Sequence, residues 1–312
     1  MNFQQLRIIR ETVRQGYNLT EVANALYTSQ PGVSKHIRDL EEELGIELFV
    51  RKGKRLLGLT EPGKALLVVV ERMLLDAKNI KSLAEQYSSL DVGQLTVVTT
   101  HTQARYSLPS VVGEFKRLFP KVHLRMHQGS PREIHQMLLD GQADIGIATE
   151  ILANVDEFIS FPYYQWKHLV VVRNDHPLLH LNQPTLAAVA EYPIVTYQEG
   201  FTGRMKIDET FAQLGLSPDI AISALDSDVI KTYVELGLGV GIIAGMAYNP
   251  IKDAALTVLP IDPSTPFPQN TTSIAVRKGH YLRAFAHQFI ELCNAELTQA
   301  HLKAVLGERF SD

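Results

Sequence analysis

The most constraining feature of the sequence is a short predicted helix with clear start and stop signals, followed at once by a basic turn. Ser29 is placed to cap this helix, Pro31 is tolerated in its first turn, and Gly45 can end it. Apolar residues at helical spacing predict its buried face: Val33, Ile37, Leu40 and Leu44. Shorter helical patterns precede Ser29. Short helices that meet at a tight turn have the geometry of a helix-turn-helix.

The predicted helix carries a polar stripe on the side opposite its buried face. Gln30, Ser34 and Arg38 recur at a spacing of four residues, and Pro31 and Lys35 flank them. Gln and Arg can make bidentate contacts to base edges, whereas Ser and Lys suit bases or phosphates. A polar face in contact with solvent would explain the stripe equally well.

The segment after this helix favours DNA binding over a merely solvated surface as the interpretation of the polar stripe. Two short apolar stretches, 48–50 and 56–57, enclose a turn that contains four cations: Arg51, Lys52, Lys54 and Arg55. Such a cluster can reach the phosphates or the adjacent minor groove of a duplex, and a solvated surface gives no reason for its position. The sequence therefore predicts a winged helix-turn-helix over residues 1–59 that binds DNA through the polar stripe and the basic turn.

Residues 60–89 indicate one long helix with a heptad pattern. Thr60 can cap it, and Pro62 lies in its first turn. Apolar residues alternate at spacings of four and three: Leu66, Val70, Met73, Ala77, Ile80, Ala84 and Tyr87. A helix packed on its own domain is the simpler interpretation, but this repeat is typical of two paired helices. We therefore expect this segment to form a homodimer.

The remaining residues, 90–312, alternate between predicted strands and helices. This pattern predicts an α/β domain with a largely parallel sheet. Three strands end in hydroxyl-rich segments, at 99–106, 148–150 and 196–204. Helix N-termini attract anions, and ligands of open α/β sheets bind at the carboxyl ends of strands. Each threonine alone suits an ordinary helix cap, but three such ends favour a site for a small anionic effector.

Composition excludes several classes of protein. The net charge of −4 argues against a uniformly basic coat for nucleic acid, although not against a local basic patch. Cys293 is the only cysteine, so no disulfide can form within the chain, which fits a reducing cytosol. The start of the chain holds no apolar signal core, and no apolar run approaches the ~20 residues of a membrane span. We therefore expect a cytoplasmic location and no membrane contact.

An enzyme acting on a small anionic substrate is the main alternative class. Ser107 and Ser130 lack a nucleophile elbow, and no phosphate-binding glycine loop is present. His123 and His127 have a spacing that binds metal on a helix, but they lie in a strand pattern. The sequence therefore predicts no catalytic residue, no metal site and no cofactor other than an effector. The N-terminal domain opposes a third alternative, a solute-binding protein.

Four segments carry a family pattern: Phe3–Leu6, Ala23–Glu41, Leu44–Arg51 and Leu59–Gly63. They resemble the N-terminal domain of LysR-type transcriptional regulators, and the match covers residues 1–65 nearly without gaps. The resemblance implies promoter DNA and RNA polymerase as partners. It also implies that the heptad helix is the dimerising linker of this family.

Further segments extend the resemblance into the last domain: 99–106, 127–131, 201–204, 226–234 and 236–241. They are similar to the CysB and Cbl branch of the LysR-type family, and the opening residues, the basic turn and segment 291–295 are closer to Cbl. That branch regulates genes for sulfate assimilation and organosulfur use, including alkanesulfonates. The effectors that the branch implies are sulfate, thiosulfate, adenosine 5′-phosphosulfate and acetylserine, and the sequence does not choose among them.

The resemblance also implies a fold and a pocket. The effector domain would be of the periplasmic-binding-protein type, with two α/β lobes joined by two crossover strands. Lobe I would span about 90–163 and 267–300, and lobe II about 164–266. The family's sulfate-type pocket falls on five residues here: Thr100, Thr102, Gln103, Thr149 and Thr202. Effector domains would pair further into a homotetramer, and an anion that closes the lobes would change the spacing or bend of the bound DNA.

Overall fold

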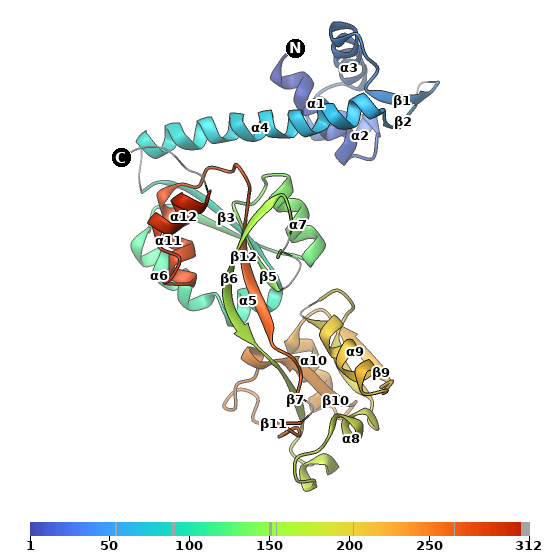
Figure 1. The fold of residues 1–312 in the computed structure, drawn as a ribbon, viewed down its shortest axis with the longest axis vertical. Helices are drawn as coiled ribbons and strands as arrows, with labels where there is room; N and C mark the ends of the chain where they lie inside the picture. The colour runs from blue at the N-terminus through green and yellow to red at the C-terminus, as the bar shows by residue number, and fades with distance from the viewer. Residues whose placement is uncertain are drawn as a thin grey trace. The chain divides into compact units, whose positions relative to one another are not determined.

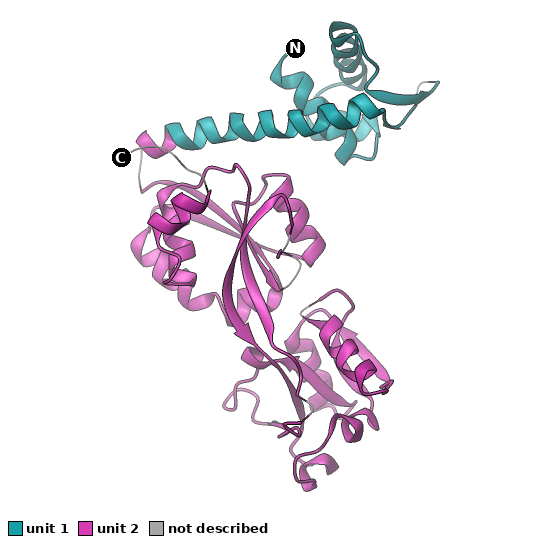
Figure 2. Cartoon of the chain, viewed as in Figure 1, with its two compact units in different colours: residues 1–84 teal, residues 85–312 magenta. Residues whose placement is uncertain are grey.

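The structure is a computed structural model that describes residues 1–53, 55–88, 91–149, 152–153, 155–201, 203–264 and 266–306. The chain divides into two compact units, residues 1–84 and residues 85–312 (Figure 2). Within the described ranges, no helix is both long and apolar enough to cross a membrane.

The first unit is a winged helix-turn-helix followed by a long helix. Its elements are α1 (Phe3–Arg14), α2 (Leu19–Ala25), α3 (Gln30–Leu44), β1 (Phe49–Lys52), β2 (Arg55–Leu59) and α4 (Glu61–Ser88). Val33, Ile37 and Leu40 are buried in α3 as predicted. Leu44 is 37% exposed, so its predicted burial is wrong. Leu44 is the last residue of α3, and the left-handed Gly45 ends the helix directly after it, so no further helical turn covers its side chain.

The heptad positions of α4 divide into two groups. Val70 is 1% exposed and, with Met73, belongs to a cluster that contains Leu6 of α1. Farther along the helix, Ile80 is 69% exposed and Tyr87 is 80% exposed. The first half of the apolar seam therefore packs on its own domain, and the second half presents apolar side chains without cover in a single chain.

The second unit contains two five-stranded sheets, each the centre of one lobe. Lobe I has the strand order β4-β3-β5-β12-β6. Its strands are β3 (Gly93–Thr99), β4 (Val122–Gln128), β5 (Ile145–Thr149), β6 (Phe158–Trp166) and β12 (Asn270–Arg277). Its helices are α5 (His101–Tyr106), α6 (Pro109–Leu118), α7 (Pro131–Leu139), α11 (Ala284–Cys293) and α12 (Gln299–Leu306).

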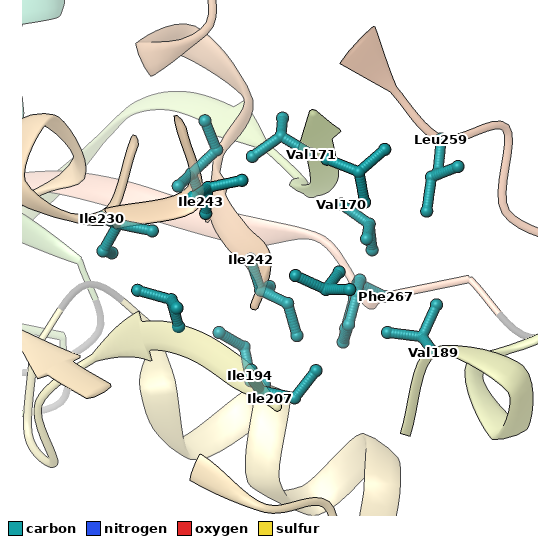
Figure 3. Packing of buried hydrophobic residues seen from close by; sticks show 14 of the residues in the cluster. Val170, Val171, Val189, Ile194, Ile207, Ile230, Ile242, Ile243, Leu259 and Phe267 are labelled. Carbon is teal, nitrogen blue, oxygen red and sulfur yellow. The ribbon is translucent and has the colours of Figure 1, made fainter. Parts of the chain in front are cut away.

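Lobe II has the strand order β11-β7-β10-β8-β9. Its strands are β7 (His168–Arg173), β8 (Ile194–Tyr197), β9 (Ile220–Ala224), β10 (Val240–Ala244) and β11 (Leu256–Val258). Its helices are α8 (Leu186–Ala190), α9 (Arg204–Gln213) and α10 (Ser227–Glu235), with 3₁₀ turns η1 (Pro177–His180) and η2 (Gly245–Ala247). Figure 3 shows its core, in which Ile194, Ile230 and Ile242 come from a strand, a helix and a second strand.

The expectation of a largely parallel sheet is wrong for both lobes. β3 pairs in parallel with β4 and β5, and β8 does so with β9 and β10. The pairs of β12 with β5 and β6, and of β7 with β10 and β11, are antiparallel. In lobe I the antiparallel pairs involve the two crossover strands, β6 and β12, which carry the chain between the lobes in opposite directions (Figure 1). In lobe II they involve β7, which follows β6 in the chain.

Candidate DNA interface and effector site

The start of α3 presents the predicted reading face. Ser29 caps the helix, since its hydroxyl accepts a hydrogen bond from the Gly32 amide at 3.2 Å. The predicted contact residues lie on the side away from the core and are exposed, except for Ser34, which is half-buried: Gln30, Pro31, Ser34, Lys35 and Arg38. Polar donors at the first turns of an exposed helix have the placement that major-groove recognition requires.

The basic turn is a hairpin between β1 and β2. The strands pair antiparallel, with Lys52 opposite Arg55. Arg51, Lys52 and Arg55 are exposed, whereas the predicted Lys54 lies outside the described residues. Gly53 has a φ of +61°, a left-handed conformation that favours glycine at this tight turn.

Glu41 fixes the hairpin to the end of α3. Its Oε1 accepts hydrogen bonds from the backbone amides of Leu48 and Phe49, at 2.8 and 3.3 Å. Its other oxygen forms an ion pair with Arg51. Arg51 is therefore held by a carboxylate while it stays exposed, and the strand that carries the basic turn is tied directly to the reading helix.

In lobe I the predicted effector residues lie around the start of α5. Thr100 occupies the N-cap position without making a side-chain capping bond and is 6% exposed. Thr102 and Gln103 are each 1% exposed, and Thr149 is half-buried at the end of β5. The hydroxyl of Thr102 is buried and has no hydrogen-bond partner within the described part of the chain. The predicted Thr202 lies outside the described residues.

Thr272 of the crossover strand β12 links two of these residues, Gln103 and Thr149. Its Oγ1 lies 3.2 Å from Gln103 Nε2, 3.3 Å from Thr149 Oγ1 and 3.1 Å from Trp166 Nε1. Gln103 in turn accepts a hydrogen bond from the Tyr164 hydroxyl at 2.6 Å. Burial raises the pKa of Tyr164, so this hydroxyl stays protonated and donates at neutral pH. The network consists of uncharged groups.

The lobe II side of this region is closely packed around Gly203, the N-cap of α9. Gly203 has a φ of +69°, and an added Cβ would lie 2.7 Å from Asn270 Oδ1 and 2.9 Å from His168 Cε1. Only glycine fits here. Asn270 is fully buried, and in the described ranges its Oδ1 has no hydrogen-bond partner.

A second polar cluster joins the two lobes through Asp228, near the start of α10. The Tyr106 hydroxyl, from α5 of lobe I, donates to Asp228 Oδ1 at 2.6 Å. Arg105 forms an ion pair with the other oxygen, and Lys231 Nζ lies 3.4 Å from Oδ1. Burial opposes ionisation of Asp228, but the Tyr106 bond and the two cations outweigh it and lower the pKa of this carboxyl. Asp228 is therefore anionic and bridges the lobes.

The same cluster contains the one group of possible metal ligands found among the described residues. His101, Asp226 and Asp228 each offer a ligand atom, and these atoms lie within 4.8 Å of one another. The cations Arg105 and Lys231 already neutralise Asp228, and they would repel a metal ion.

Comparison with known proteins identifies the family. Residues 3–64 match the bacterial regulatory helix-turn-helix proteins of the lysR family, and residues 88–298 match the LysR substrate binding domain. The chain belongs to the LysR family of transcriptional regulators. The predictions of a DNA-binding regulator and of a protein that is not an enzyme are thereby confirmed.

Two relatives of this LysR-family regulator span almost its whole length. It is 54% identical to the transcriptional regulator SsuR of Burkholderia cenocepacia over 99% of both chains. It is 52% identical to the regulator Cbl of Escherichia coli, over 99% of this chain and 97% of the other. The crystal structure of the cofactor-binding domain of Cbl superposes with a TM-score of 0.65 at 45% identity, covering 69% of this chain and 93% of that one. The predicted CysB and Cbl branch and the two-lobed fold are confirmed.

The sequence alone missed several residues of both sites. Tyr27 has a φ of +51° and is 97% exposed directly before the reading helix of this LysR-family protein. Its motif neighbours Ser29 and Gln30 could have drawn attention to it. Glu41 and Asp228 lie in segments that resemble the family, but nothing near them in the sequence indicates the contacts of Glu41 with the wing or the bond of Asp228 to Tyr106, 122 residues away. Thr272 carries no local signal, because Gln103 is 169 residues away.

Proposed function

We propose that this LysR-family protein regulates genes of sulfur assimilation and organosulfur use, including sulfonates, in response to a small sulfur-related anion or an acetylserine-type effector. The observation that carries the proposal is the buried, uncharged donor cluster of α5 and β5, in which the Thr102 hydroxyl has no partner among the described residues. A buried polar group without a partner is costly, so it suits a place that a ligand completes. The similarity to SsuR and Cbl supports the same branch.

The DNA side of the proposal has two kinds of contact. Gln30, Pro31, Ser34, Lys35 and Arg38 would meet base edges and nearby phosphates in the major groove. The wing would add phosphate or minor-groove contacts through four cations: Arg51, Lys52, Lys54 and Arg55. The DNA-binding domain would comprise residues 1–59, the linker helix 60–89 and the effector domain 90–312.

The effector side would hold the anion between the lobes. The proposed ligand-binding residues are Thr100, Thr102, Gln103, Thr149 and Thr202. The candidate effectors are sulfate, thiosulfate, adenosine 5′-phosphosulfate and acetylserine. An effector can shift the protein between states only by binding one lobe arrangement better than the other.

Assembly is the third part of the proposal. Ile80 and Tyr87, two seam positions of α4, are 69% and 80% exposed, and such apolar side chains suit a partner helix. We propose a homodimer through α4, a homotetramer through the effector domains, and contact with RNA polymerase at the promoter in the cytoplasm.

Gel-shift titration of the full chain tests the proposal. Promoter fragments from sulfur-metabolism genes should bind better than random competitor DNA at moderate ionic strength, and one of the four effectors should change the shift. Arg38→Ala should weaken specific binding, while Arg117→Ala, which changes an exposed cation of α6, should not. Equal affinity for promoter and competitor DNA would reject the regulator's proposed targets, and a response only to unrelated metabolites would assign it to another pathway.

A further inference from the structure

We infer that Thr272 is the positioning residue of the effector site, and that it orients the site's hydrogen-bond donors so that the site selects an oxyanion without a proton. The inference rests on the proposed function, because it concerns the same pocket. Thr272 is fully buried on a crossover strand, and it is absent from the set of residues that the sequence predicts.

The hydrogen-bond capacity of Thr272 determines the direction of each bond. A hydroxyl offers two acceptor positions and one donor, whereas the indole N–H only donates. Trp166 therefore donates to Thr272. Gln103 accepts from the Tyr164 hydroxyl through Oε1, so its amide nitrogen faces Thr272 and donates as well. Both acceptor positions are then occupied, and the Thr272 proton goes to Thr149.

These bond directions leave hydrogen-bond donors available for a ligand. Thr149 accepts from Thr272 and so keeps its own hydroxyl proton for a ligand. Gln103 uses one amide hydrogen on Thr272 and retains the second. The Thr102 hydroxyl, buried and without a partner in the described ranges, adds a third donor. One buried hydroxyl, that of Thr272, thus fixes the direction of two of the three donors.

A donor-only arrangement distinguishes anions by their protonation. Sulfate carries no proton near neutral pH and can accept every one of these bonds. Phosphate is largely protonated at about pH 6, and its P–O–H group needs an acceptor. The network that Thr272 organises contains no carboxylate, and a hydroxyl that accepted the proton would be lost as a donor to the anion. One such lost bond corresponds to roughly a tenfold loss of affinity.

Anion titration of the full chain tests the inference. Trp166 is the only tryptophan and contacts Thr272 directly, so its fluorescence reports binding, and calorimetry provides a second readout. The probes are sodium sulfate and sodium phosphate at constant ionic strength and about pH 6. Wild type should bind sulfate at least about tenfold more tightly than phosphate.

Three variants distinguish a positioning role of Thr272 from a general disturbance of the fold. Thr272→Val keeps the shape but removes the hydroxyl, and should lower sulfate affinity about tenfold while phosphate affinity changes little. Thr272→Ser restores the hydroxyl and should recover most of the selectivity. Thr99→Val is the matched control, because Thr99 is also fully buried in lobe I but its hydroxyl donates to the Ile147 carbonyl, outside the network. It should keep the wild-type ratio. Thr272→Ala replaces Thr272→Val if the latter does not fold.

The outcomes that overturn the inference are distinct from those that overturn the proposed function. Wild-type selectivity in Thr272→Val, or the same loss in Thr99→Val, contradicts the positioning role. Equal binding of sulfate and phosphate, or binding of neither, contradicts the donor-only site. In that case the proposed function would still hold if acetylserine changed promoter binding, because the gel shift measures promoter binding and depends on neither sulfate nor phosphate.

Discussion

Replacing Asp228 by Asn removes the negative charge that joins α5 of lobe I to α10 of lobe II. The bond at stake is the one from the Tyr106 hydroxyl to Asp228 Oδ1, at 2.6 Å. Arg105 and Lys231 lose their shared counter-charge at the same time, although Lys231 keeps its bond to Asp253. We expect Asp228→Asn and Tyr106→Phe to weaken the contact between the lobes, and a double-mutant cycle measures the shared part.

The magnitude follows from the type of bond and its exposure. A hydrogen bond to a charged group contributes about 1.5–3 kcal/mol when it is sheltered. The Asp228 side chain is 35% exposed, so solvent screens part of this energy. We therefore expect a coupling free energy of about 1–2 kcal/mol between Tyr106 and Asp228. Because the pKa of Asp228 is lowered on folding, its contribution is complete above the usual titration range of Asp and is lost as pH falls below that range.

Urea unfolding of the full chain, followed by Trp166 fluorescence, provides the assay. Trp166 is buried at the end of crossover strand β6, so its emission reports the effector domain rather than the DNA-binding domain. Asp175→Asn is the matched control, because Asp175 pairs with Arg173 on the surface of lobe II alone, and it should leave the free energy of unfolding nearly unchanged. A coupling energy below about 0.3 kcal/mol would refute the reasoning.

Three further predictions concern other parts of the chain. Lys231→Met leaves Asp253 buried without its partner at 2.9 Å, so the free energy of unfolding should fall by about 3–5 kcal/mol in the same urea assay; a smaller loss than for Asp228→Asn would contradict this. Glu41→Ala removes the acceptor of two wing amides, which should destabilise the first unit by about 1–3 kcal/mol by circular dichroism and weaken promoter binding. In DNA titrations at several salt concentrations, Arg38→Ala should cost about 1–3 kcal/mol on the cognate site, whereas Lys52→Ala should lower the salt slope by about 1 on every sequence; identical effects would contradict the division into base and phosphate contacts.

The sequence was sufficient for features whose causes act over a few residues. Ser29 caps α3 and Gly45 ends it, because each acts on backbone groups within one turn of itself. The polar stripe follows from the same helical period, and so does the alternation of strands and helices that identified an α/β domain. The resemblance implied the pocket threonines of α5 and β5, and the structure keeps them in the segments that the sequence placed at strand ends. That these side chains bind DNA or an effector stays a prediction.

Tertiary structure decided what those side chains meet. The period of α4 could not tell whether Val70 packs on α1 or on a second chain, since an apolar stripe has the same spacing in both cases. Gln103 and Thr272 are 169 residues apart, and Tyr106 and Asp228 are 122 apart. Only the return of β12 beside β5 and the contact of α5 with α10 bring these pairs together. A hydrogen bond depends on distances of about 3 Å, which local sequence patterns do not determine across such separations.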